Sequence, residues 1–310
     1  VKFTYKEDLG TSIPGFMPES RLLGLSDGFT APGWQFAAGL QPNLEKNNQQ
    51  NFLFSNQTWF NKSPNFNDLI TQTERHNINA KITLEPFKDF KVDVDFNKDY
   101  RNNHTEIFKY KDDKGMFMQI ARLDGGSFEA TYSSFNTLFS NSDELFAQMK
   151  ANRIIVSQNL PNITQDTHAI YSQFRQGYGP GSFAVVVPAF LAAYRGEDIN
   201  NVKLDLRNDI KNYKYIPRPN WSLRYDGLSK LKPFKKFLTN FSLRHAYKAT
   251  IAVNNFYTNP DYTENNQYKV NSENGNYYSQ IEIPFVSTRE DFSPMLGIDL
   301  KTTGGIDIKF

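Results

Sequence analysis

The stretch from residue 217 to 256 constrains the fold most, because it alternates between two kinds of side chain without a break from Phe237 to Val253. Successive side chains of a β-strand point to opposite faces. The odd-numbered positions therefore form a mostly apolar, aromatic face and the even-numbered positions a polar, charged or small one. The run is about three times the usual strand length of roughly 5–6 residues. Such a strand is typical of a sheet that has an apolar environment on one side and water on the other.

The composition agrees with a sheet of this kind. Aromatic residues make up 15% of the 310 residues, with 27 Phe and 16 Tyr, while hydrophobic residues reach only 39% and the mean hydropathy is negative. Alternation dilutes hydropathy in this way in a transmembrane β-barrel. A large soluble β-rich binding protein fits the composition equally well. The net charge of +2 argues against nucleic-acid binding, and the absence of cysteine excludes disulfides, thiol catalysis and Cys-ligated metal.

No apolar run reaches the roughly 20 residues of a membrane helix; the longest, from Phe183 to Tyr194, is interrupted by Pro188. It predicts a buried helix or two short helical pieces. The chain starts without Met and ends on the alternating residues Ile306, Ile308 and Phe310. We therefore expect a piece of a longer protein, so that a missing signal peptide carries no weight.

Two further alternating strands are predicted at residues 75–85 and 90–100, joined as a hairpin. The connecting sequence EPFKDF at 85–90 resembles KPFKKF at 232–237, and each precedes a long alternating strand. Proline stops strand pairing, Phe suits a membrane interface, and Lys reaches lipid headgroups. We interpret both as turns at a membrane edge; the alternative is a proline-initiated turn in a soluble hairpin.

The remaining segments predict one barrel segment over 1–310 with long loops and short helical insertions. Residues 10–74 are expected to be loop-rich, 75–133 to form strands, 142–195 to be a helical insertion, and 202–310 to hold long strands. Within these, KDDKG and DGG are expected to be turns between short strands of 106–133. Residues 142–159 are predicted to be a helix capped by Ser142, and 277–286 a strand. The fold class is thus mainly β, an antiparallel transmembrane barrel segment.

No catalytic arrangement is evident, so the chain is not expected to be an enzyme or to hold a cofactor or metal. The four histidines, at positions 76, 104, 168 and 245, lack metal-ligand spacing. Asp93 and Asp95 share a strand face with other polar residues and are interpreted as solvated. GYGPG at 177–181 lacks the following Lys-Ser/Thr of a phosphate loop and predicts a turn.

Several strings together resemble one family. They are PGFMP near residue 15, APGW at 31–34, the GYGPGS…VPAFLAAYRG block, PRPNWSLRYDGLSKL…FKKF…FSLRHAYKAT, and FSPMLGIDL at 292–300. They are similar to the SprA/Sov family, the outer-membrane translocon of the type IX secretion system of Bacteroidetes. The Arg244-His245 pair departs slightly from the family pattern, which has Ser before His.

The resemblance implies a very large single-chain barrel in the outer membrane that exports folded cargo proteins. It also implies a smaller outer-membrane barrel partner at a lateral opening, a periplasmic plug protein, and membrane lipid as partners, but no nucleic acid. This chain would be a small part of such a protein. The alternatives are a nutrient-uptake barrel, a soluble or surface-anchored β-sandwich that binds glycans and, less favoured, an outer-membrane hydrolase.

The alternation assigns residues to two surfaces. The predicted lipid-facing residues are Phe237, Phe241, Leu243, Tyr247, Ile251, Ile78, Ile82, Leu84, Val92 and Val94. The predicted lumen-facing residues are Asn240, Ser242, Arg244, Lys248, Lys81, Asp93 and Asp95. Because a spanning strand needs only about 9–11 residues, the alternation beyond about Tyr247 is expected to serve packing against inserted segments.

Overall fold

The structure, a computed structural model, describes all residues except 45–50, 162–170, 202–216, 264 and 267–268. The chain divides into two compact units. Unit 1 holds residues 1–5, 77–100 and 127–310, and unit 2 holds residues 6–76 and 101–126. The predicted strand character of 202–216 lies outside the described residues, as does His168.

The chain is mainly β, as predicted, and the register pairs that the structure defines in unit 1 are antiparallel. The strands form one sheet in the order β1-β2-β3-β4-β6-β8-β9, with β5 pairing with β3 and β6, and β7 with β6. The strands are β1 (Lys2–Ser12), β2 (Ile70–Phe87), β3 (Phe90–Lys111), β4 (Met116–Thr131), β5 (Asn220–Tyr225), β6 (Leu238–Thr258), β7 (Ile281–Phe292), β8 (Gly297–Thr302) and β9 (Asp307–Lys309).

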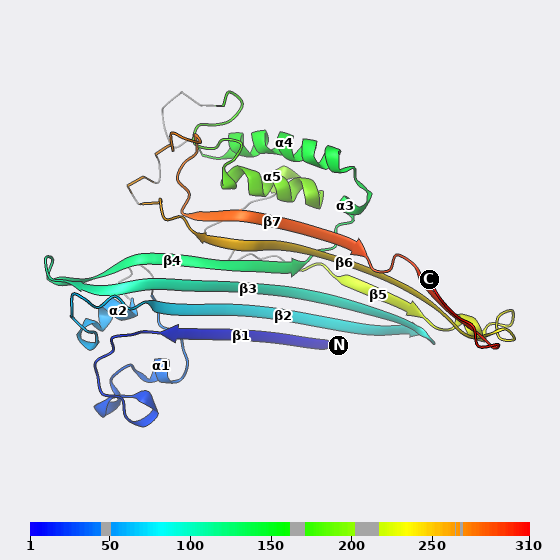
Figure 1. Cartoon of the computed structure of the whole chain (residues 1–310), viewed down its shortest axis with the longest axis horizontal. Coiled ribbons are helices and arrows are strands. Elements are labelled where there is room, and N and C mark those ends of the chain that lie inside the picture. The colour runs from blue at the N-terminus through cyan, green and yellow to red at the C-terminus, as the bar shows by residue number, and fades with distance from the viewer. Residues whose placement is uncertain (45–50, 162–170, 202–216, 264, 267–268) are drawn as a thin grey trace. The chain divides into compact units, whose positions relative to one another are not determined.

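The predicted long strand is confirmed as β6, which runs for 21 residues (Figure 1). The predicted hairpin is also present, but its strands are longer than expected, with 18 residues in β2 and 22 in β3. Only Lys88 and Asp89 separate them, and Asp89 takes the left-handed conformation with φ 68°. Such a tight turn requires positive φ, which Asp tolerates better than most residues.

At two places in the sheet, two separate strands follow each other end to end beside the same neighbouring strand of unit 1. Both β4 and β5 lie between β3 and β6: β4 ends at Thr131, whose carbonyl accepts from Arg218 N, just before β5 begins at Asn220. On the other side of β6, β7 pairs with residues 247–258 and β8 with residues 238–244. The helical insertion therefore leaves and re-enters the sheet within one strand position.

The helices are α1 (Trp34–Ala37), α2 (Phe52–Ser55), α3 (Asn136–Phe139), α4 (Ser142–Asn159) and α5 (Phe183–Arg195). Short 3-10 turns lie at Leu22–Gly24, Asp27–Phe29, Gln57–Trp59, Ile199–Asn201 and Leu228–Lys230. The prediction of a helix at 142–159 is confirmed, but its cap is Asn141, whose side chain accepts from Asp143 N, and not Ser142. None of the helices in the described part of the chain is long and apolar enough to cross a membrane.

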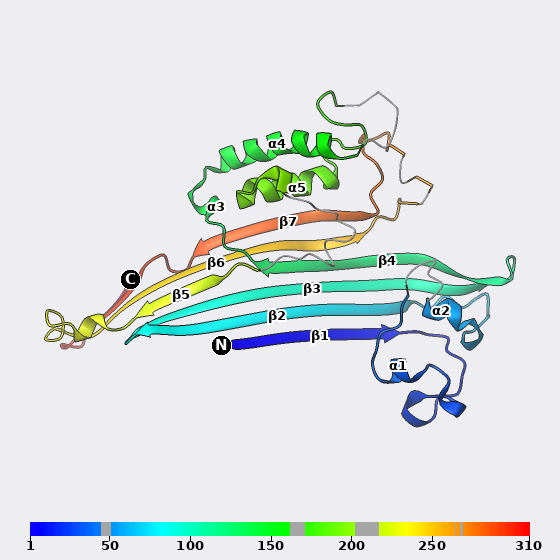
Figure 2. The same cartoon turned by 180° about the vertical axis from the view of Figure 1, so that it is seen from behind.

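Helix α5 forms as a single helix in spite of Pro188 and lies between α4 and strand β7 (Figures 1 and 2). Val187 and Leu191 from α5 join Ile251 and Val253 from β6 in the core of unit 1. Burying aliphatic side chains of this kind stabilises by roughly 1.5–3 kcal/mol each. This packing fixes the insertion on one face of the sheet.

Unit 2 has its own core, in which loop residues pack on strands β2, β3 and β4. Leu53, Phe60, Phe108 and Phe117 belong to one buried cluster, in which the rings of Phe108 and Phe117 stack at 4.7 Å. The predicted loop-rich region contains α1, α2 and three 3-10 turns, but β1 reaches Ser12 and β2 begins at Ile70, inside it.

Two predicted boundaries are wrong. The DGG sequence at 124–126 is not a turn, because β4 continues through it and pairing along β4 overrides the local turn signal. The strand predicted at 277–286 begins at Ile281 and continues to Phe292, since Tyr277 bonds to the loop at Gly177 and not to β6.

Candidate functional site: the two faces of the long strands

The register of β3, β5 and β6 builds one continuous apolar face in unit 1. Directly paired residues of antiparallel strands share a face. The rows across the three strands are Phe90–Tyr225–Leu243, Val92–Leu223–His245 and Val94–Trp221–Tyr247. We call this surface the apolar face. It carries the predicted residues Val92, Val94, Leu243 and Tyr247, and by alternation along β6 also Phe241. Phe237 precedes β6 and lies beyond a register shift between Leu238 and Asn240, so this alternation does not assign it to a face.

The opposite surface, which we call the polar face, is charged. Lys91 pairs with Arg224, and Arg224 with Arg244, whose guanidinium lies 2.8 Å from the carboxylate of Asp299. Asp93 lies on this face with Lys81 of β2, at 3.6 Å. Residues Ile78, Ile82 and Leu84 have the opposite parity to Lys81, so they point to the other side of β2.

The remaining polar positions differ in exposure. Asp95 and Lys248 are exposed, and Lys248 is paired in register with Asp291. Ser242 is buried, with 1% of its surface exposed, and its hydroxyl donates to Asn240 Oδ1 at 3.1 Å. Ser242 is therefore not a wetted surface residue in this structure, although it has the parity of the polar face.

Aromatic rings and lysines gather where β2 meets β3 and where the chain enters β6. The rings of Phe87 and Phe90 stack at 4.8 Å, and Tyr225 meets both edge-on. Phe234 meets Phe241 at 5.2 Å. The exposed lysines of these turns are Lys88, Lys232, Lys235 and Lys236. We call this region the aromatic–lysine end; rings that sit at headgroup depth beside lysines are typical of a membrane interface.

The other half of the apolar face is covered by the segment at Ser134 and Phe135 and by helix α5. Tyr247 is fully buried: its hydroxyl donates to Glu290 at 3.0 Å and accepts from the backbone N–H groups of Ser134 and Phe135. Ile251 is 2% exposed and packs in the core with α5. The expectation that the alternation beyond Tyr247 serves packing against inserted segments agrees with this. Tyr247 and Ile251 are covered by protein, so a lipid-facing role does not fit them.

The uncovered part of the apolar face has a defined length. Where the chain enters β6, it extends from Phe237, which precedes the strand and is 67% exposed, to His245, next to buried Tyr247. On β3 it extends from Phe90 to Lys98, after which Tyr100 is buried in the core. Each span is close to the roughly 9–11 residues that a tilted strand needs to cross a bilayer.

The described histidines have structural partners. His76 lies 2.6 Å from Glu74, and His245 Nδ1 lies 2.6 Å from the carbonyl of Met295. In the described part of the chain, no cluster of three or more His, Asp or Glu side chains is arranged to hold a metal ion.

Unit 2 contains a buried charged network that was not predicted from the sequence. Glu106 is fully buried and accepts from Gln119 Nε2 at 2.9 and 3.1 Å and from Arg122 Nη1 at 3.1 Å. His104 lies between Glu106, at 3.5 Å, and Asp124, at 2.8 Å. Gln119 and Arg122 also donate to the carbonyl of Leu44, which ties the loop to strands β3 and β4. Alternation along β3 could have indicated this network, because His104 and Glu106 point to the same side of the strand as the buried residues Tyr100 and Phe108.

This network predicts a pH-dependent stability. Burial alone would lower the pKa of His104, but its hydrogen bond to Asp124 and the nearby carboxylate of Glu106 outweigh burial and raise the pKa to about 9. A folded-state pKa above the unfolded value stabilises fully below about pH 6.5, and this stabilisation is lost as pH rises toward 9. We expect about 2–3 kcal/mol to disappear over that range. Thermal melts from pH 6.5 to 9 should show it, and His104→Gln should flatten that part of the profile. Equal pH dependence in both proteins would contradict the assignment.

No protein-family model matches the chain, and no curated protein matches it either.

Proposed function

We propose that this chain forms part of the wall of a protein-conducting β-barrel in the outer membrane, with no catalytic role. The observation that carries the proposal is the uncovered apolar span, which begins at the aromatic–lysine end and has the length of one bilayer crossing on both β3 and β6. The apolar face in this span meets lipid. The polar face, with Lys91, Arg224 and Arg244 in one row, meets water in the lumen.

The charged residues indicate which of the two faces is in contact with water. Arginine or lysine at the bilayer midplane costs about 2–4 kcal/mol on the lipid side of a barrel. With three basic residues in one row, together with Asp93 and Asp95, the free-energy cost of placing the polar face in lipid would be prohibitive. The same residues are ordinary in a water-filled interior.

The sequence resemblance to the SprA/Sov family supplies the cargo and the partners of the proposal. The exported substrates are folded secreted proteins, and the companions are a smaller outer-membrane barrel and a periplasmic plug protein. A nutrient-uptake barrel shares the wall but not the resemblance. A β-sandwich is less favoured, because helices and not a second sheet cover the apolar face in the described part of unit 1.

Photocrosslinking in secreting cells tests the conducting role. A benzoylphenylalanine at position 95 or 248, on the polar face, is expected to crosslink to exported proteins in transit. The same group at position 94, next to 95 but on the apolar face, is expected to give none. Cargo crosslinks from position 94 with none from 95 and 248 would contradict the proposal.

A further inference from the structure

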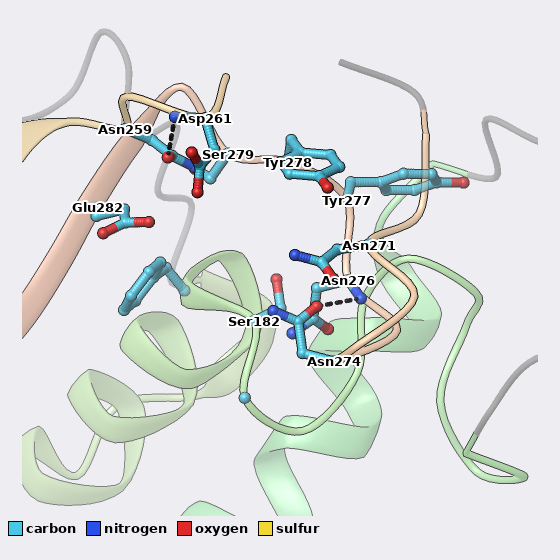
Figure 3. A pocket seen from close by; sticks show the side chains of 12 residues that line it. Ser182, Asn259, Asp261, Asn271, Asn274, Asn276, Tyr277, Tyr278, Ser279 and Glu282 are labelled. Atoms are coloured by element: carbon cyan, nitrogen blue, oxygen red, sulfur yellow. Dashed lines mark hydrogen bonds between the residues drawn. The ribbon is translucent and has the colours of Figure 1, made fainter. Parts of the chain in front are cut away.

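A polar pocket of about 250 Å³ lies in unit 1 where β6 ends and where β7 and α5 begin (Figure 3). Its lining is dominated by amides and tyrosines, namely Asn259, Asn271, Asn274, Asn276, Tyr277 and Tyr278. The pocket is at the opposite end of β6 from the aromatic–lysine end. The 21 residues of β6 extend about 70 Å, so the proposed membrane span does not reach it.

The loop glycines of the GYGPG sequence hold one wall of the pocket in place. Gly177 has φ +76°, and a Cβ there would come within 2.1 Å of the Tyr277 ring. Tyr277 N donates to the Gly177 carbonyl at 2.8 Å, and Gly179 N donates to Asn276 Oδ1 at 2.8 Å. The glycines therefore let residues 276 and 277 lie directly on the backbone, which makes the wall rigid before any ligand arrives.

The side-chain amides of the four asparagines are oriented by the hydrogen bonds that their Oδ1 atoms accept. The Oδ1 atoms accept backbone N–H groups as follows: Asn259 from Asp261, Asn271 from Glu273, Asn274 from Asn276, and Asn276 from Gly179, at 2.8–2.9 Å. Because a backbone N–H can only donate, each Oδ1 is identified and each Nδ2 is left as a donor. Among the described residues, none of these Nδ2 groups donates to a protein acceptor.

The other lining groups narrow the ligand class. Glu282 and Asp261 supply carboxylate acceptors, and no lysine or arginine is among the described residues that line the pocket, which disfavours an anion. Tyr278 and Phe183 supply aromatic rings. Oriented amide donors, carboxylate acceptors and rings fit a compound that both donates and accepts hydrogen bonds and has an apolar C–H face.

We propose that this pocket binds a neutral saccharide residue. Sugar hydroxyls and the ring oxygen accept from the Asn amides, hydroxyl protons go to Glu282, and the C–H face of the sugar ring lies on Tyr278. The volume is just below the roughly 300–1,000 Å³ of drug-sized sites, which suits a single sugar ring. The site is independent of the proposed channel role, since it depends on no membrane contact.

Saturation-transfer NMR tests the site on the protein in lauryldimethylamine oxide, a detergent without a sugar headgroup. The probes are the methyl glycosides of glucose, galactose, mannose and N-acetylglucosamine. At least one is expected to receive saturation from the protein. Tyr278→Ala is expected to weaken its binding at least tenfold, and Tyr278→Phe, which keeps the ring, to change it less than about threefold. Asn254→Ala, on the exposed part of β6 outside the pocket, is the matched control and should change nothing.

Two outcomes overturn the proposal. The first is no transfer to any glycoside, including the case in which a peptide binds instead. The second is glycoside binding that Tyr278→Ala leaves intact, because that binding lies elsewhere. Neither outcome bears on the channel, which position-specific crosslinking tests separately.

Discussion

Replacing Val94 with arginine is expected to destabilise the protein in a bilayer by about 2–4 kcal/mol. Val94 lies in the middle of the uncovered span of β3, on the apolar face, and under the proposed function an arginine there would have to leave water. Leu243→Arg, on the uncovered span of β6, is expected to have a similar effect. Urea titration of the protein reconstituted in phosphatidylcholine vesicles measures both.

Two controls separate lipid contact from ordinary packing. Asp95→Arg changes the neighbouring residue on the opposite, exposed face and is expected to cost less than about 1 kcal/mol. Phe237→Arg tests depth, because arginine near an interface costs only about 0–1 kcal/mol. Ser242 is unsuitable as a polar-face control, since it is buried and bonded to Asn240. Equal losses for Val94→Arg and Asp95→Arg would contradict the assignment of faces.

Replacing Glu106 with alanine is expected to destabilise unit 2 by about 3–5 kcal/mol. The change removes the carboxylate that accepts from Arg122 and Gln119 and leaves Arg122 and a protonated His104 without their buried counter-charge. Since Gln119 and Arg122 also hold the Leu44 carbonyl, the loop should detach from the strands at the same time.

Hydrogen exchange at the amides of β3 and β4 around Phe108 and Phe117 measures this loss locally. Glu129→Ala is the matched control, because Glu129 lies on β4 but is exposed, and its effect should stay within about 0.5 kcal/mol. Protection at Phe108 and Phe117 that is unchanged in Glu106→Ala would show that the network does not hold the loop.

The sequence was sufficient for the parts of the fold that local patterns determine. The alternation from Phe237 onward predicted β6, and the helical signals from Ser142 to Asn159 predicted α4. The division of one strand position between β4 and β5 could not be predicted, because it depends on pairing between residues about 90 positions apart, such as Thr131 and Arg218. The DGG error has the same origin, since a turn sequence yields to strand pairing along β4.

The candidate surfaces were predicted in part. Alternation separated Val94 from Asp95 and Leu243 from Arg244, and the register of unit 1 is consistent with both separations. Alternation cannot tell which protein segment covers a face, so the burial of Tyr247 under Ser134 and Phe135 required the three-dimensional structure. The pocket Asn residues come from a polar loop whose composition alone indicated only an irregular connection.

Spin-label accessibility in vesicles tests the central claim most directly, and the absence of cysteine makes single-cysteine labelling straightforward. Labels at positions 92, 94, 241 and 243 are predicted to be relaxed by oxygen more than by a water-soluble nickel chelate. Labels at 91, 95, 244 and 248 are predicted to show the reverse. Nickel access that is equal on the two faces would contradict the account, because both faces would then be in water.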